Sequence, residues 1–334
     1  MKILNTKDGV NVFSAFDGIS GGQFTLKKLG IHINKYYASE IEPNAIAITQ
    51  QNFPNTIQLG DIKNIKGKDL DTIHLLIGGS PCQSLSIASR SKESGLVSGK
   101  STIFYEYVRL LKEVKPIYFL LENVASMKKK DKDEISKELG VEPVLINSKN
   151  FSGQLRSRLY WTNIPQDEMP QKEDIKLSSL LDNAYSERDK SYCITATYNR
   201  ACAQDYFLFG QRQMVFKKPV TVEYKSEYIS LINDDGKEYK EKRKIAYFTT
   251  QGKTYRLDKK DKNSALQKLK INEVMRKLSP VECEKLQCLD FDYTKYGLFN
   301  GKKKEIKTAD RYHSIGNGWT ISVIQHVMKR LKEL

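Results

Sequence analysis

Residues 11–29 read NVFSAFDGISGGQFTLKKL and contain the clearest structural signal in the chain. It begins with a short apolar run, Asn11–Phe16, passes through a glycine-rich turn, and ends in a helical pattern over Gly22–Leu29. A strand followed at once by a helix is typical of a parallel sheet that helices cover on both faces. The stretch therefore predicts the first strand and the first helix of such a sheet.

The same alternation continues outward to residue 165. Further helical patterns cover Pro43–Asn52 and Thr102–Val114, and between them lie short apolar runs that we predict to be strands: Tyr36–Glu40, Ile57–Asp61, His74–Ser80, Tyr118–Val124, Val141–Ser148 and Arg158–Asn163. We therefore expect an α/β fold built on a doubly wound, mostly parallel sheet. Sheets of this kind bind their ligands at the carboxyl ends of the strands.

The pattern changes after Pro165. Residues 166–271 contain β-prone pieces, and we expect them to form a smaller, strand-rich domain with strands near Tyr192–Tyr198, Gln213–Tyr224 and Lys244–Thr250. We expect the basic run Lys242-Arg243-Lys244 in a mobile loop of this domain.

Helical pattern returns after residue 272. Ser279-Pro280-Val281-Glu282 has the Ser, Pro and Glu of a capped helix start. A final amphipathic helix is predicted over Ile321–Leu331. We expect this last part of the chain to return to the first domain.

The composition of the 334 residues restricts the class of protein. Lys and Arg number 55 against 40 Asp and Glu, a net charge of +15, which is typical of chains that meet nucleic acid but also of surfaces that serve solubility alone. We see no apolar stretch long enough to span a membrane and no signal peptide. The 5 cysteines, an odd number, indicate a reducing cytoplasm, and with 4 scattered histidines we expect no metal site.

The first polar motif is the turn Phe16 to Gly22. Its glycines allow the backbone to approach a ligand, and the helix that follows points its N-terminus at the same place, although the spacing is not that of a dinucleotide fingerprint. Glu40 and Asp61 end the next two predicted strands, where such folds hold ribose hydroxyls. Together these features predict a nucleoside-containing cofactor.

Three further motifs could carry chemistry. Cys82 follows Pro81 at the end of a buried strand and precedes a polar loop, 83–100, that we expect to act as a mobile lid. Near a cation or a helix N-terminus, its thiol would become a nucleophilic thiolate. Glu122 directly follows an apolar strand, and Arg156 and Arg158 could grip a phosphate, a carboxylate or a base carbonyl. Each alone could equally be structural: an inert cysteine, a capping glutamate, a surface salt bridge.

Taken in order, these motifs resemble the cytosine-5 DNA methyltransferase family. That family has a glycine-bearing first turn, Pro-Cys, Glu-Asn-Val, Gln-x-Arg-x-Arg, a variable target-recognition domain and a closing Gly-Asn helix. The chain carries a counterpart of each conserved part: Phe16 to Gly22, Pro81-Cys82-Gln83, Glu122-Asn123-Val124, Gln154 to Arg158, Ser279 to Leu286 and Gly316-Asn317. Gln83 is similar to bacterial and phage members, whereas Asp17 and Trp319 are similar to the animal de novo branch.

The resemblance implies an activity and a domain plan. It implies a sheet of the S-adenosylmethionine-dependent methyltransferase type, with a catalytic domain over 1–165 and 272–334 and a target-recognition domain over 166–271. The implied reaction moves a methyl group from S-adenosyl-L-methionine to C5 of a cytosine flipped out of a specific duplex DNA sequence, through a covalent Cys82 adduct at C6. The product would be S-adenosyl-L-homocysteine, and no metal is implied.

The resemblance also implies roles for single residues. Cys82 would attack C6, Glu122 would hold N3 and the exocyclic amine, and Arg158 would hold O2 with Arg156 in support. The cofactor would lie along the residues Phe16, Asp17, Gly18, Gly21, Glu40, Ile41, Asp61, Ile62 and Pro81, with Asn317 closing the site. DNA would be contacted by Gln83, Ser84, Ser86, Lys242, Arg243 and Lys244.

Two alternatives stay open. Cys193-Ile194-Thr195 with Tyr198 is similar to the transfer-RNA branch, which would make the chain an RNA cytosine-5 methyltransferase. An inactive DNA-binding homologue is the other, although such proteins lose the cysteine or the glutamate. We expect a cytoplasmic monomer in a bacterial or phage-infected cell, and the resemblance suggests a cognate restriction endonuclease as a further partner.

Overall fold

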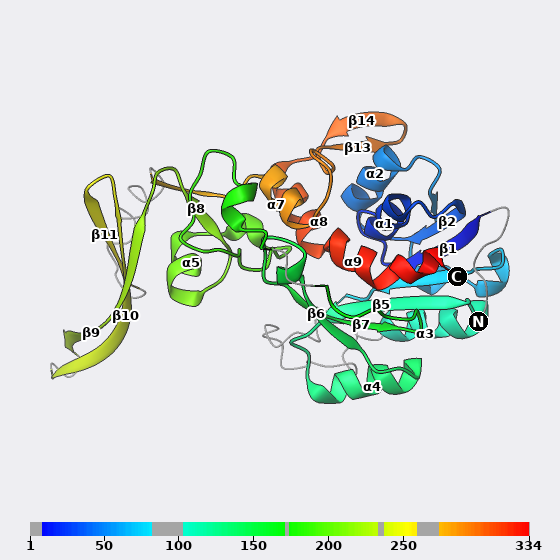
Figure 1. Cartoon of the computed structure of the whole chain (residues 1–334), viewed down its shortest axis with the longest axis horizontal. Helices are drawn as coiled ribbons and strands as arrows, with labels where there is room; N and C mark the ends of the chain where they lie inside the picture. The colour runs from blue at the N-terminus through cyan, green and yellow to red at the C-terminus, as the bar shows by residue number, and fades with distance from the viewer. Residues whose placement is uncertain (1–8, 82–102, 171–173, 233–236, 259–273, 334) are drawn as a thin grey trace.

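The computed structural model describes residues 9–81, 103–170, 174–232, 237–258 and 274–333. A 7-stranded sheet in the order β3-β2-β1-β4-β5-β7-β6 forms the centre of its larger part (Figure 1). The neighbours from β3 to β5 are parallel, and β7 is antiparallel to both β5 and β6. The strands are β1 (Val10–Ala15), β2 (Ile33–Ser39), β3 (Ile57–Gln58), β4 (Leu75–Gly79), β5 (Tyr118–Val124), β6 (Val144–Asn147) and β7 (Ser157–Thr162). The predicted doubly wound, mostly parallel sheet is confirmed.

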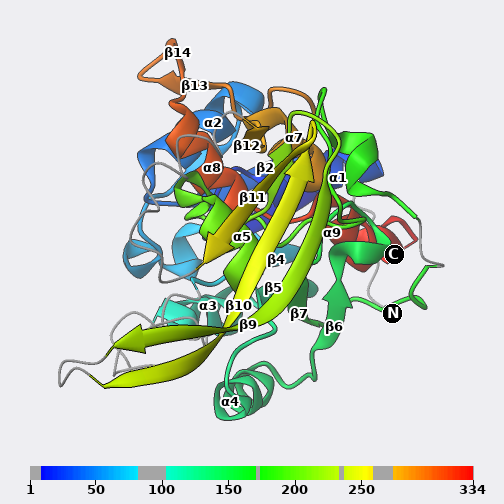
Figure 2. The same ribbon diagram turned by 90° about the vertical axis from the view of Figure 1, so that its left-hand side faces the viewer.

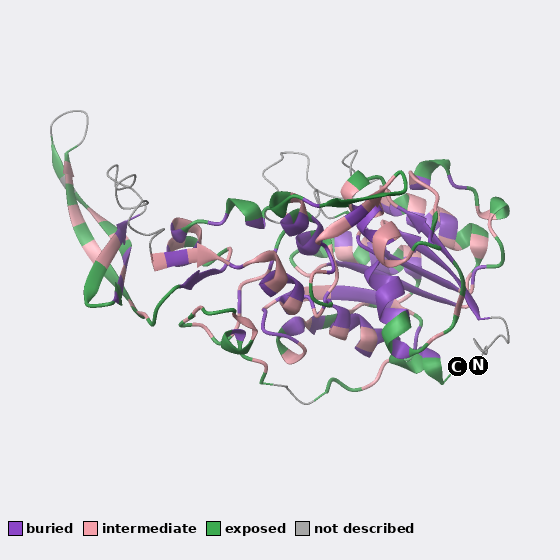
Figure 3. Ribbon diagram, turned by 90° about the horizontal axis from the view of Figure 1, so that it is seen from above, coloured by how far each residue is buried: buried purple, intermediate pink, exposed green. Residues whose placement is uncertain are grey.

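Helices bury both faces of this sheet, which is why its strands read as continuous apolar runs (Figure 3). On one face Val10 and Val12 of β1 pack in a core with α1 (Gly21–Leu29) and α9 (Ile321–Met328). On the other face Phe13 and Ala15 join a core with α3 (Ile103–Val114) and α4 (Lys129–Leu139). The alternate residues of a strand thus serve two separate cores.

Most of the predicted elements appear within two or three residues of their expected ends. The helix α2 has the expected bounds, Pro43–Asn52, whereas β3 is shorter than the strand expected over Ile57–Asp61 because Asp61 caps a short 3-10 helix that starts at Ile62. The helix α4 is not evident from the sequence. Only Ile135 and Leu139 supply apolar side chains to its buried face, and the rest of KKDKDEISKEL is mostly charged, so its periodicity is weak.

A separate aromatic core holds much of the middle of the chain. It contains Tyr206 and Phe207 of α5 (Ala203–Phe209), Phe216 of β8 (Met214–Phe216) and Phe248 of β10 (Glu238–Thr250). The strand β8 pairs with β12 (Met275–Lys277). The strand predicted over Tyr192–Tyr198 does not form. The backbone there serves other partners: Ile194 accepts a hydrogen bond from the Arg156 side chain, and Tyr198 begins a 3-10 helix.

A long three-stranded ribbon projects from the end of the molecule opposite α1 (Figures 1 and 2). It consists of β9 (Thr221–Ile232), β10 (Glu238–Thr250) and β11 (Lys253–Asp258), all antiparallel. The prediction of a mobile loop at Lys242-Arg243-Lys244 is wrong, because these residues lie inside β10. Because charged side chains lie on both faces of this strand, its sequence lacks the alternation of polar and apolar residues that predicts a strand.

The last part of the chain packs on the large sheet. Ser279 caps α7 (Pro280–Leu286) in a capping box with Glu282, as the sequence predicted. A hairpin of β13 (Tyr296–Phe299) and β14 (Lys302–Glu305) precedes α8 (Thr308–Asn317), and Val323 and Val327 of α9 enter the core beneath α1. None of the described helices is long and apolar enough to cross a membrane.

Candidate active site

The first turn is fastened to the end of the second strand by Glu40. Its Oε2 accepts the Gly18 N–H at 2.8 Å, and its Oε1 accepts the N–H groups of Ile41 at 2.7 Å and Glu42 at 2.9 Å. The turn itself is tightly wound, since Phe16, Gly18 and Ser20 all have left-handed backbone angles near φ 60°. Glu40 therefore fixes the turn and keeps a carboxylate at the carboxyl edge of the sheet.

Apolar surface lies next to this carboxylate. Ile41 is 64% exposed although it is a large aliphatic residue, and Phe16 in the neighbouring turn is only half-buried. Asp61 follows β3 and accepts a hydrogen bond from the N–H of Lys63, while Ile62 is buried beneath it. Carboxylates can accept hydrogen bonds from the ribose hydroxyls of a nucleoside, and the exposed apolar surface beside them can pack against its flat base.

Asp17 is the one acid of this region that is turned inward. Its Oδ1 accepts the hydroxyl of Tyr36 at 2.9 Å, and its Oδ2 is enclosed without a hydrogen-bond partner among the described residues. Burial raises the pKa of the Asp17 carboxyl to about 6, and the nearby negative charge of Glu40 adds to the rise. Gly21, also expected at the cofactor, packs close to Ile321 and Trp319.

Glu122 lies near the end of β5, buried, with a donor on each carboxylate oxygen. Arg158 Nε lies 2.8 Å from its Oε1, and the indole Nε1 of Trp319 donates to its Oε2 at 3.1 Å. Gly79 of the adjacent strand leaves room for this arrangement: a Cβ there would lie 2.9 Å from Trp319 Nε1 and 3.1 Å from Glu122 Oε2. The structure thus brings Glu122 and Arg158 together. Trp319 is an addition that the sequence signalled only through its position after Gly316-Asn317-Gly318.

Arg156 points into the protein and joins three segments. The side chain is buried and donates to the carbonyl oxygens of Ile194 and Gly318, each at 2.8 Å, and of Gly316 at 3.3 Å. Gly316 approaches this junction so closely that a Cβ would lie 2.1 Å from the carbonyl carbon of Thr195. The Arg156 side chain therefore fastens the backbones of these segments to one another.

Cys193 lies beside the same guanidinium groups. Arg156 Nη1 is 3.4 Å from its Sγ, and although burial opposes ionisation, the charges of Arg156 and Arg158 leave the pKa of the Cys193 thiol below its usual value. Cys193 is half-buried.

The remaining predicted residues fall into two groups. Pro81 is exposed just past β4, where Asn123 Nδ2 donates to the Ser80 hydroxyl at 2.8 Å, and Asn317 Nδ2 lies 3.1 Å from the Nε2 of His313. Cys82, Gln83, Ser84, Ser86 and the loop 83–100 lie outside the described residues.

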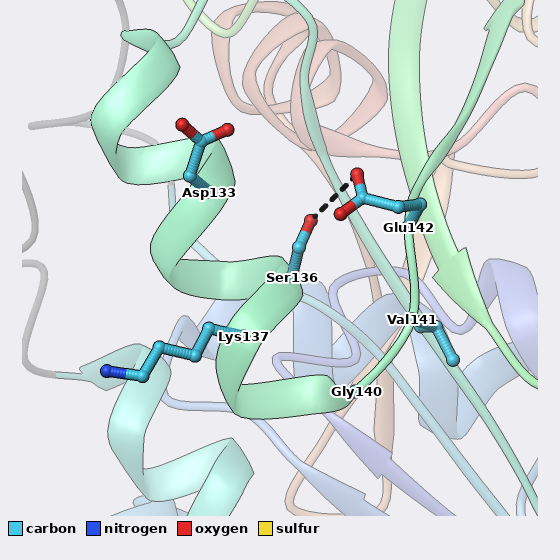
Figure 4. A pocket seen from close by; sticks show the side chains of 6 residues that line it. All are labelled: Asp133, Ser136, Lys137, Gly140, Val141 and Glu142. Atoms are coloured by element: carbon cyan, nitrogen blue, oxygen red, sulfur yellow. Dashed lines mark hydrogen bonds between the residues drawn. The ribbon is translucent and has the colours of Figure 1, made fainter.

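A hollow on the surface lies apart from all of these residues. It is formed by α4 and the residues after it, where the Ser136 hydroxyl donates to Glu142 at 3.4 Å (Figure 4). None of its six lining residues belongs to the predicted site.

Comparisons with known proteins found matches both in sequence and in fold. The family model described as C-5 cytosine-specific DNA methylase matches residues 10–333. The orphan methyltransferase M.SPRI of Bacillus phage SPR is 34% identical over 187 residues, 52% of this chain and 42% of that protein. The type II methyltransferase M.NlaIV of Neisseria lactamica is 30% identical over 171 residues, 46% of this chain and 40% of that protein. The chain thus spans about half the length of these relatives or less.

Two solved structures share the fold over nearly the whole chain. The methyltransferase EhMeth of Entamoeba histolytica aligns with a TM-score of 0.67 at 16% identity, over 97% of this chain and 98% of that one. The Dnmt2 methyltransferase of S. pombe aligns with a TM-score of 0.60 at 15% identity and the same coverage. At such identities the likeness shows the fold alone.

Proposed function

The chain belongs to the C-5 cytosine-specific DNA methylase family, and from this premise we propose that it is a DNA (cytosine-5)-methyltransferase that acts on duplex DNA. The observation that carries the proposal is the buried cluster of Glu122, Arg158 and Trp319. It lies near the ends of neighbouring strands, one of which leads through Pro81 to Cys82. A buried carboxylate paired with a cation suits the polar edge of a cytosine ring, and Cys82, which follows the neighbouring strand in sequence, supplies the thiol that methylation at C5 needs.

The turn from Phe16 to Gly22 suits S-adenosyl-L-methionine. When bound, this cofactor supplies an electrophilic methyl group on a sulfonium. Glu40 and Asp61 have the acceptors for ribose hydroxyls, and Phe16 and Ile41 offer apolar surface to the base. The proposal assigns Ile62 and Pro81 to the same site, with Asn317 at its edge.

The chemistry follows from the poor nucleophilicity of C5. The Cys82 thiolate adds to C6 and forms an S–C6 bond, which places an electron pair at C5 where it can take the methyl group. Glu122 holds N3 and the exocyclic amine, so that charge developing on the ring is stabilised in a site with little water. Loss of the C5 proton to a base then expels Cys82, and the 5,6 double bond and the thiolate are restored.

Arg158 and Arg156 have different parts in this proposal. Arg158 holds the Glu122 carboxylate by its Nε and faces the O2 of the base. Arg156 fixes the backbone on which Arg158 and Trp319 are carried, because it is bonded to carbonyl groups on both sides of the site.

The test is methyl transfer by matched cysteine variants. Tritium transfer from labelled cofactor to DNA should be abolished in Cys82→Ser and unchanged in Cys202→Ser, since Cys202 is exposed and distant in sequence from every predicted site residue. With 5-fluorocytosine in the target, which blocks the elimination step, wild type should form a denaturation-resistant adduct and Cys82→Ser should not. Turnover of Cys82→Ser within tenfold of wild type would contradict the proposal.

The substrate and its recognition are tested separately. We propose that residues 166–271 select the sequence around a flipped cytosine, and bisulfite sequencing of DNA from a host that expresses the chain would identify that sequence. Exchange of residues 166–271 for those of a relative with another site should change the methylated sequence. Transfer to RNA instead of DNA would favour the RNA methyltransferase, and a cognate endonuclease stays a prediction.

A further inference from the structure

Strand β10 divides its basic residues between the two faces of the ribbon. Successive side chains of a strand point to opposite faces, so Lys240, Lys242 and Lys244 share one face and Arg243 lies on the other. In the register with β9, Lys242 is opposite Tyr228. We call the side with Lys240, Lys242, Lys244, Tyr224 and Tyr228 the lysine face, and the reverse side the ion-pair face.

The ion-pair face has its charges matched within the protein. Arg243 is only 11% exposed and bonds Glu241 at 3.0 Å and Asp258 at 3.1 Å. Next to it, Arg256 pairs with Glu227 at 3.4 Å. These ion pairs hold the three strands together. Because the positive charges of the two arginines are already paired with carboxylates, they are poorly placed to bind a negatively charged ligand.

The lysine face is built differently. Its three lysines are exposed, and within the part of the chain that the structure describes none of them pairs with a carboxylate. Lys244 Nζ lies 4.4 Å from the centre of the Tyr224 ring, and Lys242 Nζ lies 6.0 Å from that of Tyr228, which is 67% exposed. Stacking on rings keeps such lysines extended while their charge stays available.

The lysine face is also the face turned toward the rest of the molecule. Near the base of the ribbon the same face carries Ala246 and Phe248, both buried. Phe248 stacks on Phe207 of α5 with ring centres 5.1 Å apart, and α5 lies between the ribbon and the large sheet (Figure 1). Beyond α5 the face continues uncovered toward the tip, where the side chains are exposed or half-buried (Figure 3).

We propose that the lysine face binds the sugar–phosphate backbone of duplex DNA lying between the ribbon and the large sheet. The inference rests on the proposed function, because it takes DNA as the partner. Alternate residues of a strand are ~7 Å apart, so the three lysines span ~13 Å. Over that length one DNA strand carries roughly four phosphates, enough for each lysine to meet one. Tyr228 offers an exposed ring at the same surface.

The experiment compares two variants that remove equal charge. In the first, Lys240, Lys242 and Lys244 are all changed to Gln; in the control, Lys302, Lys303 and Lys304 are changed to Gln. The control lysines are exposed on β14, on the other part of the molecule, and Lys303 likewise lies over a ring, that of Tyr296 at 4.2 Å. Binding to a mixed-sequence DNA duplex is measured as a function of salt, and thermal unfolding verifies that each variant folds.

The lysine-face variant should reduce the slope of log Kd against log salt by two to three, since each neutralised phosphate contributes about 0.9. The control should leave the slope within experimental error of wild type. Single-turnover methylation by the control variant should match that of wild type. Equal slopes for wild type and the lysine-face variant would overturn the proposal, as would equal losses in the two variants. If wild type methylates no DNA, the proposed function fails, whereas the slopes still report on the ribbon.

Discussion

Replacing Asp17 by Asn should make the protein more stable at alkaline pH relative to wild type. The folded protein raises the pKa of this carboxyl from 3.8 to about 6 because the group is buried. A raised pKa means that the folded state keeps a proton that the unfolded chain releases. The stability that goes with this proton is fully present below about pH 4 and is lost as the pH rises through about 6.

The magnitude follows from the two pKa values. At about 1.4 kcal/mol per pH unit, the gap between 3.8 and about 6 corresponds to about 3 kcal/mol of lost stability at pH 8. Roughly half of that loss falls between pH 5 and pH 8, since the unfolded chain is already largely ionised at pH 5. Asn carries no charge and should not show this loss. The side-chain amide of Asn would occupy the enclosed position of Oδ2, which has no hydrogen-bond partner among the described residues. This lowers the free energy of unfolding by an amount that does not depend on pH.

The assay is urea unfolding at several pH values between 5 and 8, for wild type, Asp17→Asn and Asp133→Asn. Asp133 is exposed on α4 and serves as the control for loss of one negative charge. The free energy of unfolding of Asp17→Asn, minus that of wild type, should grow by 1–2 kcal/mol across this range, whereas the control difference should stay flat. A flat difference for Asp17→Asn would show that the carboxyl is not held protonated, and the reasoning from burial would fail.

Three further changes test the buried cluster and its support. Glu122→Gln should slow single-turnover methylation by 10²- to 10³-fold, about 2.7–4 kcal/mol, with DNA affinity little changed; equal losses of rate and affinity would mark Glu122 as structural. Gly79→Ala should push Trp319 and Glu122 apart and lower methylation while the unfolding free energy falls by about 1–3 kcal/mol, and full activity would show that the site tolerates the methyl group. Arg156→Lys should lower the unfolding free energy by about 1.5–3 kcal/mol in urea, because a lysine cannot serve all three carbonyl groups, and no loss would refute the positioning role.

The sheet could be predicted from the sequence because its strands are buried on both faces. A strand such as Leu75–Gly79 is apolar throughout, so its type and place are evident without any partner. The helix α4 and the strand β10 were harder, since α4 has few apolar residues on its buried face and β10 carries charged side chains on both of its faces. Local pattern fails where tertiary contacts decide the structure.

The sequence predicted which residues belong to the candidate site, but it did not predict which of them contact one another. The sequence identifies Glu122 and Arg158 separately, but their pairing depends on the antiparallel register of β5 with β7, which no local pattern encodes. Trp319 comes from 197 residues further along the chain to donate to the same carboxylate. Long-range contacts of this kind are visible only in the folded protein.

The contacts of Gln154 and Arg156 join the middle of the chain to the part that carries Glu122, Arg158 and Trp319. Gln154 donates to the carbonyl of Leu286 at 2.7 Å, and Arg156 spans from Ile194 to Gly318. Both residues are buried and immediately precede the strand that carries Arg158. The last segment, the middle segment and the sheet therefore meet at one hydrogen-bonded junction and not through a bare linker. Through Arg156 the middle segment is thus hydrogen-bonded to the segment that carries Trp319, whose indole donates to Glu122.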